Sequence, residues 1–551
     1  MAEIATEKVR LLEILESDGR IIVPRYQRSY SWESENISEL WDDISTTILN
    51  ENREHFAGAL ILCDSSSKEQ FNFEIVDGQQ RLISLTILLR AMYDNLNSKT
   101  GLANDLYDHI ERGRYEEKRY FKLTLGELDQ EFFRSFIQEK DRPAQGKRGK
   151  YKSHKRIVNA YNYFDSKIKE LIKGKRRDSE SILEELFKKL KQKLIAVRIK
   201  VASEVDAYAI FETINSKKAD LTVSDLLKNF IFSNAHKVNE HTLESARQNW
   251  DLMVEALGQE IEISQYVRHY WISAYERSRD KDLYRKIKDY FKKEPDKLTV
   301  FSKMLAKEAV VYASIVTPED TESNKMTFEL LSDINFLRIR QCYPLILATM
   351  AEKIPNRDLQ KLLSKIISAS FRRGITDKNP NEVEVFYAKS AKEVRENGVT
   401  AIGRILAGLN EYNPKDKEIK SYLEENSIAE ALAKFILLHY EKSKSTEEKI
   451  IYRPTLEHIV PQNPEKLSDW GMTETEHKNY VNKIGNLTLV GKKFNSVMSN
   501  KPYKEKIKEL SKSEINIANE IAHKYKSWGK KEIDERMDEI LSFIFTQWPN
   551  N

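Results

Sequence analysis

Residues that interrupt helices are scarce in this sequence, which limits the folds open to it. Its 551 residues include only 18 glycines and 13 prolines, while lysine, glutamate, leucine and isoleucine are abundant. This composition favours helices with compact connections over a β-sandwich or a disordered chain. A chain of this length exceeds what one hydrophobic core supports, so it divides into several domains. We expect an α+β, helix-rich multidomain protein.

The charge balance gives no sign of a strongly basic nucleic-acid binder, and the cysteines give no sign of a disulfide framework or a zinc site. The net charge is only +4 at pH 7, so any surface that binds nucleic acid has to be local. Cys63 and Cys342 each stand alone in apolar surroundings, which implies neither a disulfide framework nor a zinc site. The charged N-terminal segment lacks a signal-peptide core, and no apolar run approaches about 18 residues. We therefore expect a cytoplasmic protein without a membrane span.

Three regions with different patterns follow one another along the chain. In residues 1–235, short β-branched runs alternate with amphipathic helical segments, which predicts an α+β or α/β domain. Residues 236–430 show helical periodicity almost throughout and predict an all-helical domain. Residues 431–551 combine helices with a short extended piece, a loop and the strand NLTLV (486–490).

Some elements are specific enough to predict individually. The strands of the first region are predicted at 20–24, 56–63, 71–76 and 194–201. A helix is predicted over 34–50, with Ser34 as its N-cap. After NLTLV, two long charged helices are expected to run to the end of the chain.

The segment LEHIVPQ places Glu457 beside His458, and GNLTLVGKKFN follows about thirty residues later. Hydrolysis of a phosphodiester at one metal ion requires hard oxygen ligands and a neutral imidazole that activates water. Glu457 and Asn495 can supply oxygens for Mg²⁺ or Mn²⁺. His458 can act as the base, while Asn486 braces the loop that aims it. Because neighbouring strand residues face opposite ways, the Glu–His pair has to lie at a strand end or bend.

A simpler interpretation exists for each of these residues taken alone. A single histidine on a strand is usually structural, and asparagines are common in turns. Asn500 also competes with Asn495 for the metal position. The ordered combination of the Glu457–His458 pair with the block GNLTL (485–489) favours a nuclease site.

A second group of candidate residues lies near the N-terminus. An apolar strand runs into Asp77–Gly78–Gln79–Gln80–Arg81 and then directly into a helix. Gly78 permits a tight turn, and the helix N-terminus together with Arg81 offers a site for an anion. Asp77 can hold a metal or orient Arg81.

The preceding segment PRYQRSYSW adds Arg25, Gln27 and Arg28, with aromatic side chains that suit stacking on a base. The alternative is a helix-capping turn with a structural ion pair and core aromatic residues. The residues alone do not decide between these two interpretations.

Two basic stretches stand out, residues 140–156 and KGKRR (173–177). Residues 140–156 carry eight lysines and arginines against one aspartate. Such runs are usually solvated loops, but beside a nucleic-acid channel this one would bind phosphate without reading sequence. The paired arginines of SFRRGI (370–375) either face DNA or pair with acidic residues.

These motifs resemble one known family. The Glu457–His458 pair with GNLTL and Asn495 resembles the HNH, or ββα-metal, nuclease motif. It is more closely similar to the C-terminal module of the GmrSD-type modification-dependent restriction enzymes. PRYQRSYSW, DGQQR and IFETINSKKADLTVSDLLKN resemble that family's N-terminal domain, which has a ParB/sulfiredoxin-like fold and is linked to nucleotide binding and hydrolysis. In a related effector of DNA-phosphorothioate defence, similar blocks couple modification sensing to nicking.

The resemblance implies roles for particular residues. The nucleotide-binding residues would be Arg25, Gln27, Arg28, Asp77, Gly78, Gln79, Gln80 and Arg81. Asn215 and Asp225 would scaffold that pocket. Three positions depart from the family pattern. Glu457 stands where aspartate is commoner, Asn495 where histidine is found, and Lys218 or Ala219 where glycine is usual.

The resemblance also implies a function. The protein would be a metal-dependent DNA endonuclease of bacterial anti-phage defence, with Mg²⁺ or Mn²⁺ and a nucleoside triphosphate (GTP, ATP or UTP) as cofactors. Its substrate would be DNA, including modified phage DNA. Two alternatives stay open: a non-catalytic ParB-like DNA-binding regulator, and a nucleotide-hydrolysing switch acting on a protein partner. The sequence also leaves open the modification sensed, nicking versus double-strand cleavage, and whether the protein forms a homo-oligomer.

Overall fold

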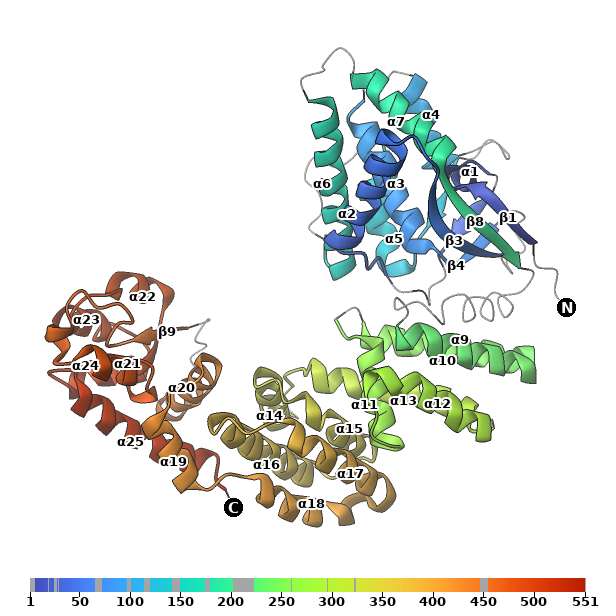
Figure 1. The fold of residues 1–551 in the computed structure, drawn as a ribbon. Helices are drawn as coiled ribbons and strands as arrows, with labels where there is room; N and C mark the ends of the chain where they lie inside the picture. Colours follow the sequence, from blue (N-terminus) through green and yellow to red (C-terminus); the bar gives the residue numbers. More distant parts are fainter. Residues whose placement is uncertain are drawn as a thin grey trace. The chain divides into compact units, whose positions relative to one another are not determined.

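A computed structural model gives the fold (Figure 1). The residues it describes are 5–17, 19–23, 27, 29–64, 72–96, 101–112, 119–140, 149–173, 179–201, 222–258, 260–294, 296–321, 324–445 and 454–550. The chain forms two compact units, each described by itself below. The first comprises Met1–Gln265 and Asp280–Ala309, and the second comprises Tyr266–Arg279 and Val310–Asn551. The predicted division at residues 235 and 430 stays a prediction.

A six-stranded mixed sheet forms the centre of the first unit (Figure 1). Its strands are β1 (Ala5–Arg10), β2 (Arg20–Ile22), β3 (His55–Asp64), β4 (Asn72–Asp77), β7 (Leu123–Thr124) and β8 (Leu194–Val201). Their order is β1-β8-β3-β4-β2-β7. β8 pairs parallel with β3 and antiparallel with β1, while β4 pairs antiparallel with β3 and parallel with β2. A separate pair consists of β5 (Glu111–Arg112) and β6 (Tyr120–Phe121).

The four strands predicted from β-branched runs are β2, β3, β4 and β8. β1 was not expected, because its sequence ATEKVR looks like a charged surface segment and, among residues 6–10, Val9 alone is buried. β1 lies at the edge of the sheet, where charged side chains are common because they discourage pairing with other molecules. Glu7 forms an ion pair with Arg198 of β8 across this edge.

Helices cover the sheet and extend beyond it (Figure 1). The helices of the first unit include α1 (Leu11–Glu16), α2 (Ser34–Asp43), α3 (Gln79–Asp94), α4 (Gly101–Asp108), α5 (Glu127–Phe133), α6 (Lys152–Ile172), α7 (Ser179–Lys193), α9 (Val223–Val238), α10 (Glu240–Leu257) and α12 (Asp280–Lys293). α3 packs against α4 and α6 and is buried almost all round. The prediction of Ser34 as an N-cap is wrong: Glu33 is the N-cap, and Ser34 is the first helical residue.

The second unit is helical except for one small sheet. Its helices include α14 (Lys325–Phe336), α15 (Tyr343–Ala351), α16 (Asn356–Ile375), α17 (Asn381–Asn397), α18 (Ile402–Leu409), α19 (Asp416–Glu425), α20 (Glu430–Lys444), α21 (Glu474–Tyr480), α22 (Lys492–Met498), α23 (Tyr503–Leu510), α24 (Asn516–Lys524) and α25 (Lys530–Gln547). α11 (Ile263–Ala274) and α13 (Lys297–Val316) each contribute to both units. The sheet pairs β9 (Thr455–His458) with β10 (Leu487–Val490). Of the described helices, none is long and apolar enough to cross a bilayer.

The prediction of two long charged helices after NLTLV is wrong. Four helices follow β10, and only α25 is long. Pro502 is the N-cap of α23 and Gly529 is the N-cap of α25. Both residues interrupt a charged pattern that otherwise reads as continuous helix.

The paired arginines of SFRRGI are structural. Arg372 is fully buried and donates to the Trp548 carbonyl oxygen at 3.0 Å, with Asp416 as its ion-pair partner. Arg373, which is 6% exposed, pairs with Glu382. Of the two interpretations, pairing with acidic residues is therefore the one observed. Arg372 also joins α16 to the end of the chain after α25.

A buried carboxylate links two helices of the second unit and can be tested by mutation. Glu441 of α20 accepts hydrogen bonds from the backbone N–H groups of Asn516 and Ile517, both at 2.9 Å, and so caps α24. We expect Glu441→Ala to destabilise this helix end by about 2 kcal/mol, because two buried N–H groups lose their acceptor. Hydrogen exchange at Asn516 and Ile517 is the measurement. Glu441→Gln, which keeps one acceptor oxygen, should lose less protection, and unchanged exchange in Glu441→Ala would contradict the capping role.

Candidate active site

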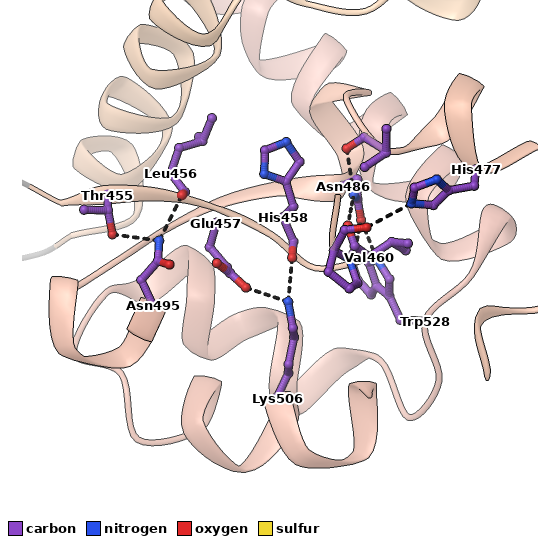
Figure 2. A network of polar contacts seen from close by, with 12 residues as sticks. Thr455, Leu456, Glu457, His458, Val460, His477, Asn486, Asn495, Lys506 and Trp528 are labelled. Atoms are coloured by element: carbon purple, nitrogen blue, oxygen red, sulfur yellow. Dashed lines mark hydrogen bonds and ion pairs between the residues drawn. The ribbon is translucent and has the colours of Figure 1, made fainter. Parts of the chain in front are cut away.

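The candidate nuclease residues lie on the small sheet of the second unit. β9 and β10 are antiparallel, with His458 opposite Leu487 and Glu457 opposite Thr488. α22 follows β10 after the single residue Gly491. His458 is the last residue of β9, so the pair does lie at a strand end. The two side chains nevertheless point to opposite sides of the strand, as its alternation requires (Figure 2).

The Glu457 side of the strand is occupied by a lysine. The Lys506 ammonium group of α23 lies 2.6 Å from Glu457 Oε1 and donates to the His458 carbonyl oxygen at 2.7 Å (Figure 2). Lys506 is fully buried and Glu457 is 6% exposed. Burial raises the pKa of Glu457 and lowers the pKa of Lys506, while their mutual attraction opposes both shifts. Each charge therefore depends on the other, because an unpaired buried charge is strongly destabilising.

Asn495 of α22 lies on the same side of β9 as Glu457 (Figure 2). Its Nδ2 donates to Thr455 Oγ1 and to the Leu456 carbonyl oxygen, both at 3.0 Å. These two bonds fix the amide plane and leave Oδ1 on the side of Glu457. The competing residue Asn500 is exposed and lies beyond the end of α22.

The His458 ring is held from the other side of the strand. Its Nε2 lies 3.0 Å from Asn482 Oδ1 and 3.4 Å from Gln462 Nε2. Burial lowers the pKa of His458, and the contact with Asn482 opposes that shift. The ring is therefore predominantly neutral at pH 7. Asn482 and Gln462 were not predicted from the sequence, because no motif separates them from ordinary polar loop residues.

Asn486 is fully buried and uses its whole amide group. Its Nδ2 donates to the carbonyl oxygens of Val460 at 3.0 Å and Val481 at 2.8 Å. Its Oδ1 accepts from the Val460 N–H at 2.9 Å and from Trp528 Nε1 at 3.1 Å. These contacts hold the chain just after His458 in place, and the predicted role of Asn486 in aiming His458 stays a prediction.

Arg536 of α25 is a supporting residue that the sequence did not reveal. It is buried, and its Nη1 donates to the carbonyl oxygens of Gly485 at 2.8 Å and Leu487 at 2.6 Å. Burial lowers the pKa of Arg536 to about 10. A Cβ atom at Gly485 would lie 2.0 Å from the Ile533 carbonyl oxygen, so only glycine lets α25 approach this closely.

The N-terminal candidates gather where β4 passes into α3. Gly78 has φ of 96°, and a Cβ atom there would lie 2.0 Å from Leu60 Cδ2. Arg81 donates through Nη1 to the Ala57 carbonyl oxygen at 2.6 Å and lies 3.9 Å from Asp77 Oδ2. Burial lowers the pKa of Arg81, and Asp77 opposes that shift. Asp77 therefore lies near Arg81, and its predicted role in orienting Arg81 stays a prediction.

Gln80 and Gln27 hold neighbouring backbone in place. Gln80 Oε1 accepts from the Ser31 N–H at 2.9 Å, and its Nε2 donates to the Ser29 carbonyl oxygen at 3.4 Å. Gln27 Nε2 donates to the Val76 carbonyl oxygen at 3.1 Å. Gln79 is buried beside them in the first turn of α3.

Some predicted residues lie elsewhere. Arg25, Arg28 and Asn215 fall outside the residues that the structure describes. Asp225 closes a capping box at the start of α9, where its carboxylate accepts from Thr222 Oγ1 at 2.6 Å.

Two family models match the chain. The N-terminal domain of the GmrSD restriction endonuclease matches residues 11–232, and the C-terminal domain of GmrSD restriction endonucleases matches residues 412–543. Together they cover more than half of the sequence. The chain belongs to the GmrSD restriction endonuclease family. No curated protein matched it in a sequence comparison.

Family membership confirms the resemblance inferred from the motifs. It supports a DNA endonuclease, a hydrolase acting in restriction and defence. The GmrSD C-terminal match contains the whole Glu457, His458, Asn486 and Asn495 group, and the N-terminal match contains the turn at Gly78.

The bonds of Asn486 predict that its removal unfolds the surroundings of the site. Asn486→Ala leaves the polar groups of Val460, Val481 and Trp528 buried without their partner, at a cost of about 1–3 kcal/mol for each group. We expect a clear drop in the melting temperature of the second unit, measured by calorimetry on the full chain. Asn495→Ala, which removes bonds from a less buried side chain, is the comparison and should melt closer to the wild type. An Asn486→Ala protein with unchanged melting and lost nuclease activity would make this residue catalytic instead.

Proposed function

We propose that this GmrSD-family protein hydrolyses DNA phosphodiester bonds at the β9–β10 sheet, as an HNH-type (ββα-metal) nuclease. The supporting observation is that Glu457 and Asn495 lie on one side of β9, within a strand–strand–helix unit of β9, β10 and α22. In this proposal Glu457 and Asn495 hold Mg²⁺ or Mn²⁺, and His458 is the general base.

The chemistry of the donors fits such a cation. A carboxylate oxygen and an amide oxygen are ligands that Mg²⁺ and Mn²⁺ prefer. The part of the chain that the structure describes holds no group of three or more His, Cys, Asp or Glu side chains suited to a metal. The cation would therefore take its remaining ligands from water and substrate, as an open catalytic site requires. When bound, it would stabilise negative charge that develops on the phosphate.

His458 has the properties of a base. Its 3.0 Å contact with Asn482 Oδ1 is a hydrogen bond if Nε2 carries the proton, which leaves Nδ1 as the nitrogen that accepts a proton from water. The ring lies on the other side of β9 from Glu457. One substrate phosphate can reach both sides only at the end of the strand, where His458 ends the ladder.

The N-terminal domain is proposed to be a ParB/sulfiredoxin-like sensor that binds a nucleoside triphosphate (GTP, ATP or UTP). Support comes from the start of α3 and from Arg81 beside it, because a helix N-terminus and a guanidinium both suit phosphate. The proposal includes licensing of cleavage by nucleotide and by DNA modification.

One observation favours the alternative of a non-catalytic DNA-binding regulator. Lys506 already neutralises Glu457, so the Glu457 side of the sheet carries a cation of its own. A carboxylate that is already paired with a buried ammonium group is less available to a metal ion.

A cleavage assay tests the residues on the two sides of β9 independently, with His458 on one side and Asn495 on the other. Purified protein is incubated with modified and unmodified plasmid DNA in Mg²⁺ or Mn²⁺, with and without each nucleoside triphosphate. We expect His458→Ala to lower the cleavage rate by about 10²–10⁴-fold, because the base is lost, and Asn495→Ala to abolish metal-dependent cleavage. His523→Ala, an exposed histidine of α24, is the matched control. Cleavage that survives Asn495→Ala but not His458→Ala would remove Asn495 from the site.

Lys506 allows a test of the metal ligands that does not depend on activity. If Glu457 binds the cation, Lys506→Met removes a competing positive charge and should tighten Mn²⁺ binding at least about tenfold. Titration followed by electron paramagnetic resonance measures the free Mn²⁺. Glu457→Gln with Lys506→Met keeps the pair uncharged and should bind no Mn²⁺. Equal Mn²⁺ affinity in all three folded proteins would reject Glu457 as a ligand.

A further inference from the structure

A cavity of about 320 Å³ opens in the first unit between the start of α2 and one face of α6. This volume is at the lower end of the range for ligand pockets. The lining residues that matter below are Trp32, Lys152, Lys155, Arg156, Asn159 and Tyr163.

The cavity is locally basic. Lys152, Lys155 and Arg156 line it, against one acidic residue, Glu33. Arg156 pairs with Glu33, and Lys152 lies 3.1 Å from Glu260. The exposed Lys155 side chain forms no hydrogen bond or ion pair with the residues that the structure describes. This is a local positive surface in a chain whose net charge is only +4, and it suits an anion.

The same cavity presents aromatic and amide groups. Trp32 is half-buried against the core of the first unit, and Tyr163 lines the α6 side. Within the described part of the chain, neither the Trp32 indole N–H nor the Asn159 amide has a hydrogen-bond partner. Aromatic rings, cations and free amide groups in one cavity are the combination that binds a nucleotide, because the ring stacks on a base while the cations contact phosphate.

We propose that this cavity binds one nucleotide of a DNA strand, with Lys155 and Arg156 at the phosphate and Trp32 against the base. The proposal rests on the proposed function in one respect, since it takes DNA to be the substrate. Lys152, Lys155 and Arg156 belong to the stretch 140–156, which carries eight lysines and arginines against one aspartate in the sequence. A sequence this rich in positive charge suits a polymer with a phosphate at every nucleotide rather than a free nucleotide.

The cavity is also linked to the turn at Gly78. The backbone N–H of Ser31, the residue before Trp32, donates to Gln80 Oε1 at 2.9 Å. Gln80 is in the first turn of α3. A strand seated on Trp32 therefore contacts a segment fastened directly to the candidate nucleotide pocket.

The test measures DNA binding by the full chain without divalent cations. Fluorescence anisotropy with labelled single-stranded and duplex oligonucleotides is recorded in EDTA, so no cleavage is required. Lys155→Gln with Arg156→Gln should weaken binding about tenfold and reduce the slope of log affinity against log salt by about 2. Lys167→Gln with Lys169→Gln removes the same charge from the same helix outside the cavity and should change neither.

Trp32→Leu provides an independent readout of stacking. It should weaken single-strand binding more than duplex binding and leave the salt slope unchanged, because a stacked base carries no charge. Melting temperatures identify any variant that has lost its fold. If Trp32→Leu is unstable, the variant at Lys155 and Arg156 still tests the cavity, because Lys155 is exposed.

Two results would overturn the proposal. One is an equal loss of affinity in the Lys167/Lys169 control, which would mean unspecific electrostatics. The other is lost binding of ATP, GTP or UTP with unchanged DNA binding, which would make the cavity a free-nucleotide site. A protein that binds DNA through the cavity but cleaves none would refute only the proposed nuclease function, and undiminished DNA binding by the cavity variants in an active nuclease would refute only this inference.

Discussion

The four hydrogen bonds of the buried Asn486 amide fix the positions on which the candidate active site depends. β9 and β10 have four residues each, and a two-stranded sheet of that size is marginal on its own. Its geometry has to be imposed by surrounding groups. Asn486 binds the chain two residues after His458 and also Trp528, while Arg536 binds the carbonyl groups on both sides of Asn486. The end of β9 is thus held in place by buried polar bonds in addition to the ladder.

Strand alternation then sets the chemistry of the site. Glu457 and His458 are neighbours in sequence, but β9 sends them to different environments. Glu457 is drawn into a buried ion pair, and His458 contacts polar amides at a more open surface. Burial acts on both residues in the direction that favours the neutral form. The ion pair with Lys506 opposes this effect at Glu457, and the contact with Asn482 opposes it at His458. The result is a neutral imidazole next to a carboxylate held by an ammonium group.

Local sequence patterns predicted four strands and the motif residues of the candidate site, because both depend on residues close together in the sequence. β2, β3, β4 and β8 follow from β-branched runs, and the motif residues around His458 were enough to identify the GmrSD family. β1 was missed because an edge strand with one buried residue has no apolar alternation to detect. Lys506, Asn482 and Arg536 were missed because their roles come from contacts with residues 24 to 51 positions away. In a sequence with 32% charged residues, nothing marks the few that become buried.

The N-terminal turn illustrates a different limit of motif reasoning. Glutamines after a glycine turn suggest hydrogen-bond donors for a ligand. In this structure, however, both polar atoms of the Gln80 amide bind backbone groups of the segment 29–31. Arg81 likewise donates through one Nη group to the Ala57 carbonyl oxygen. A Cβ atom at the neighbouring Gly58 would collide with this guanidinium group. The residues of this motif therefore connect α3 to β3 and to the segment that leads to α2. The Gln80 bonds to Ser29 and Ser31 connect the first turn of α3 to the segment just before Trp32. In the two proposals above, a nucleotide at α3 would therefore shift Trp32 only by breaking or straining these bonds. That connection would suit coupling between nucleotide binding and DNA binding.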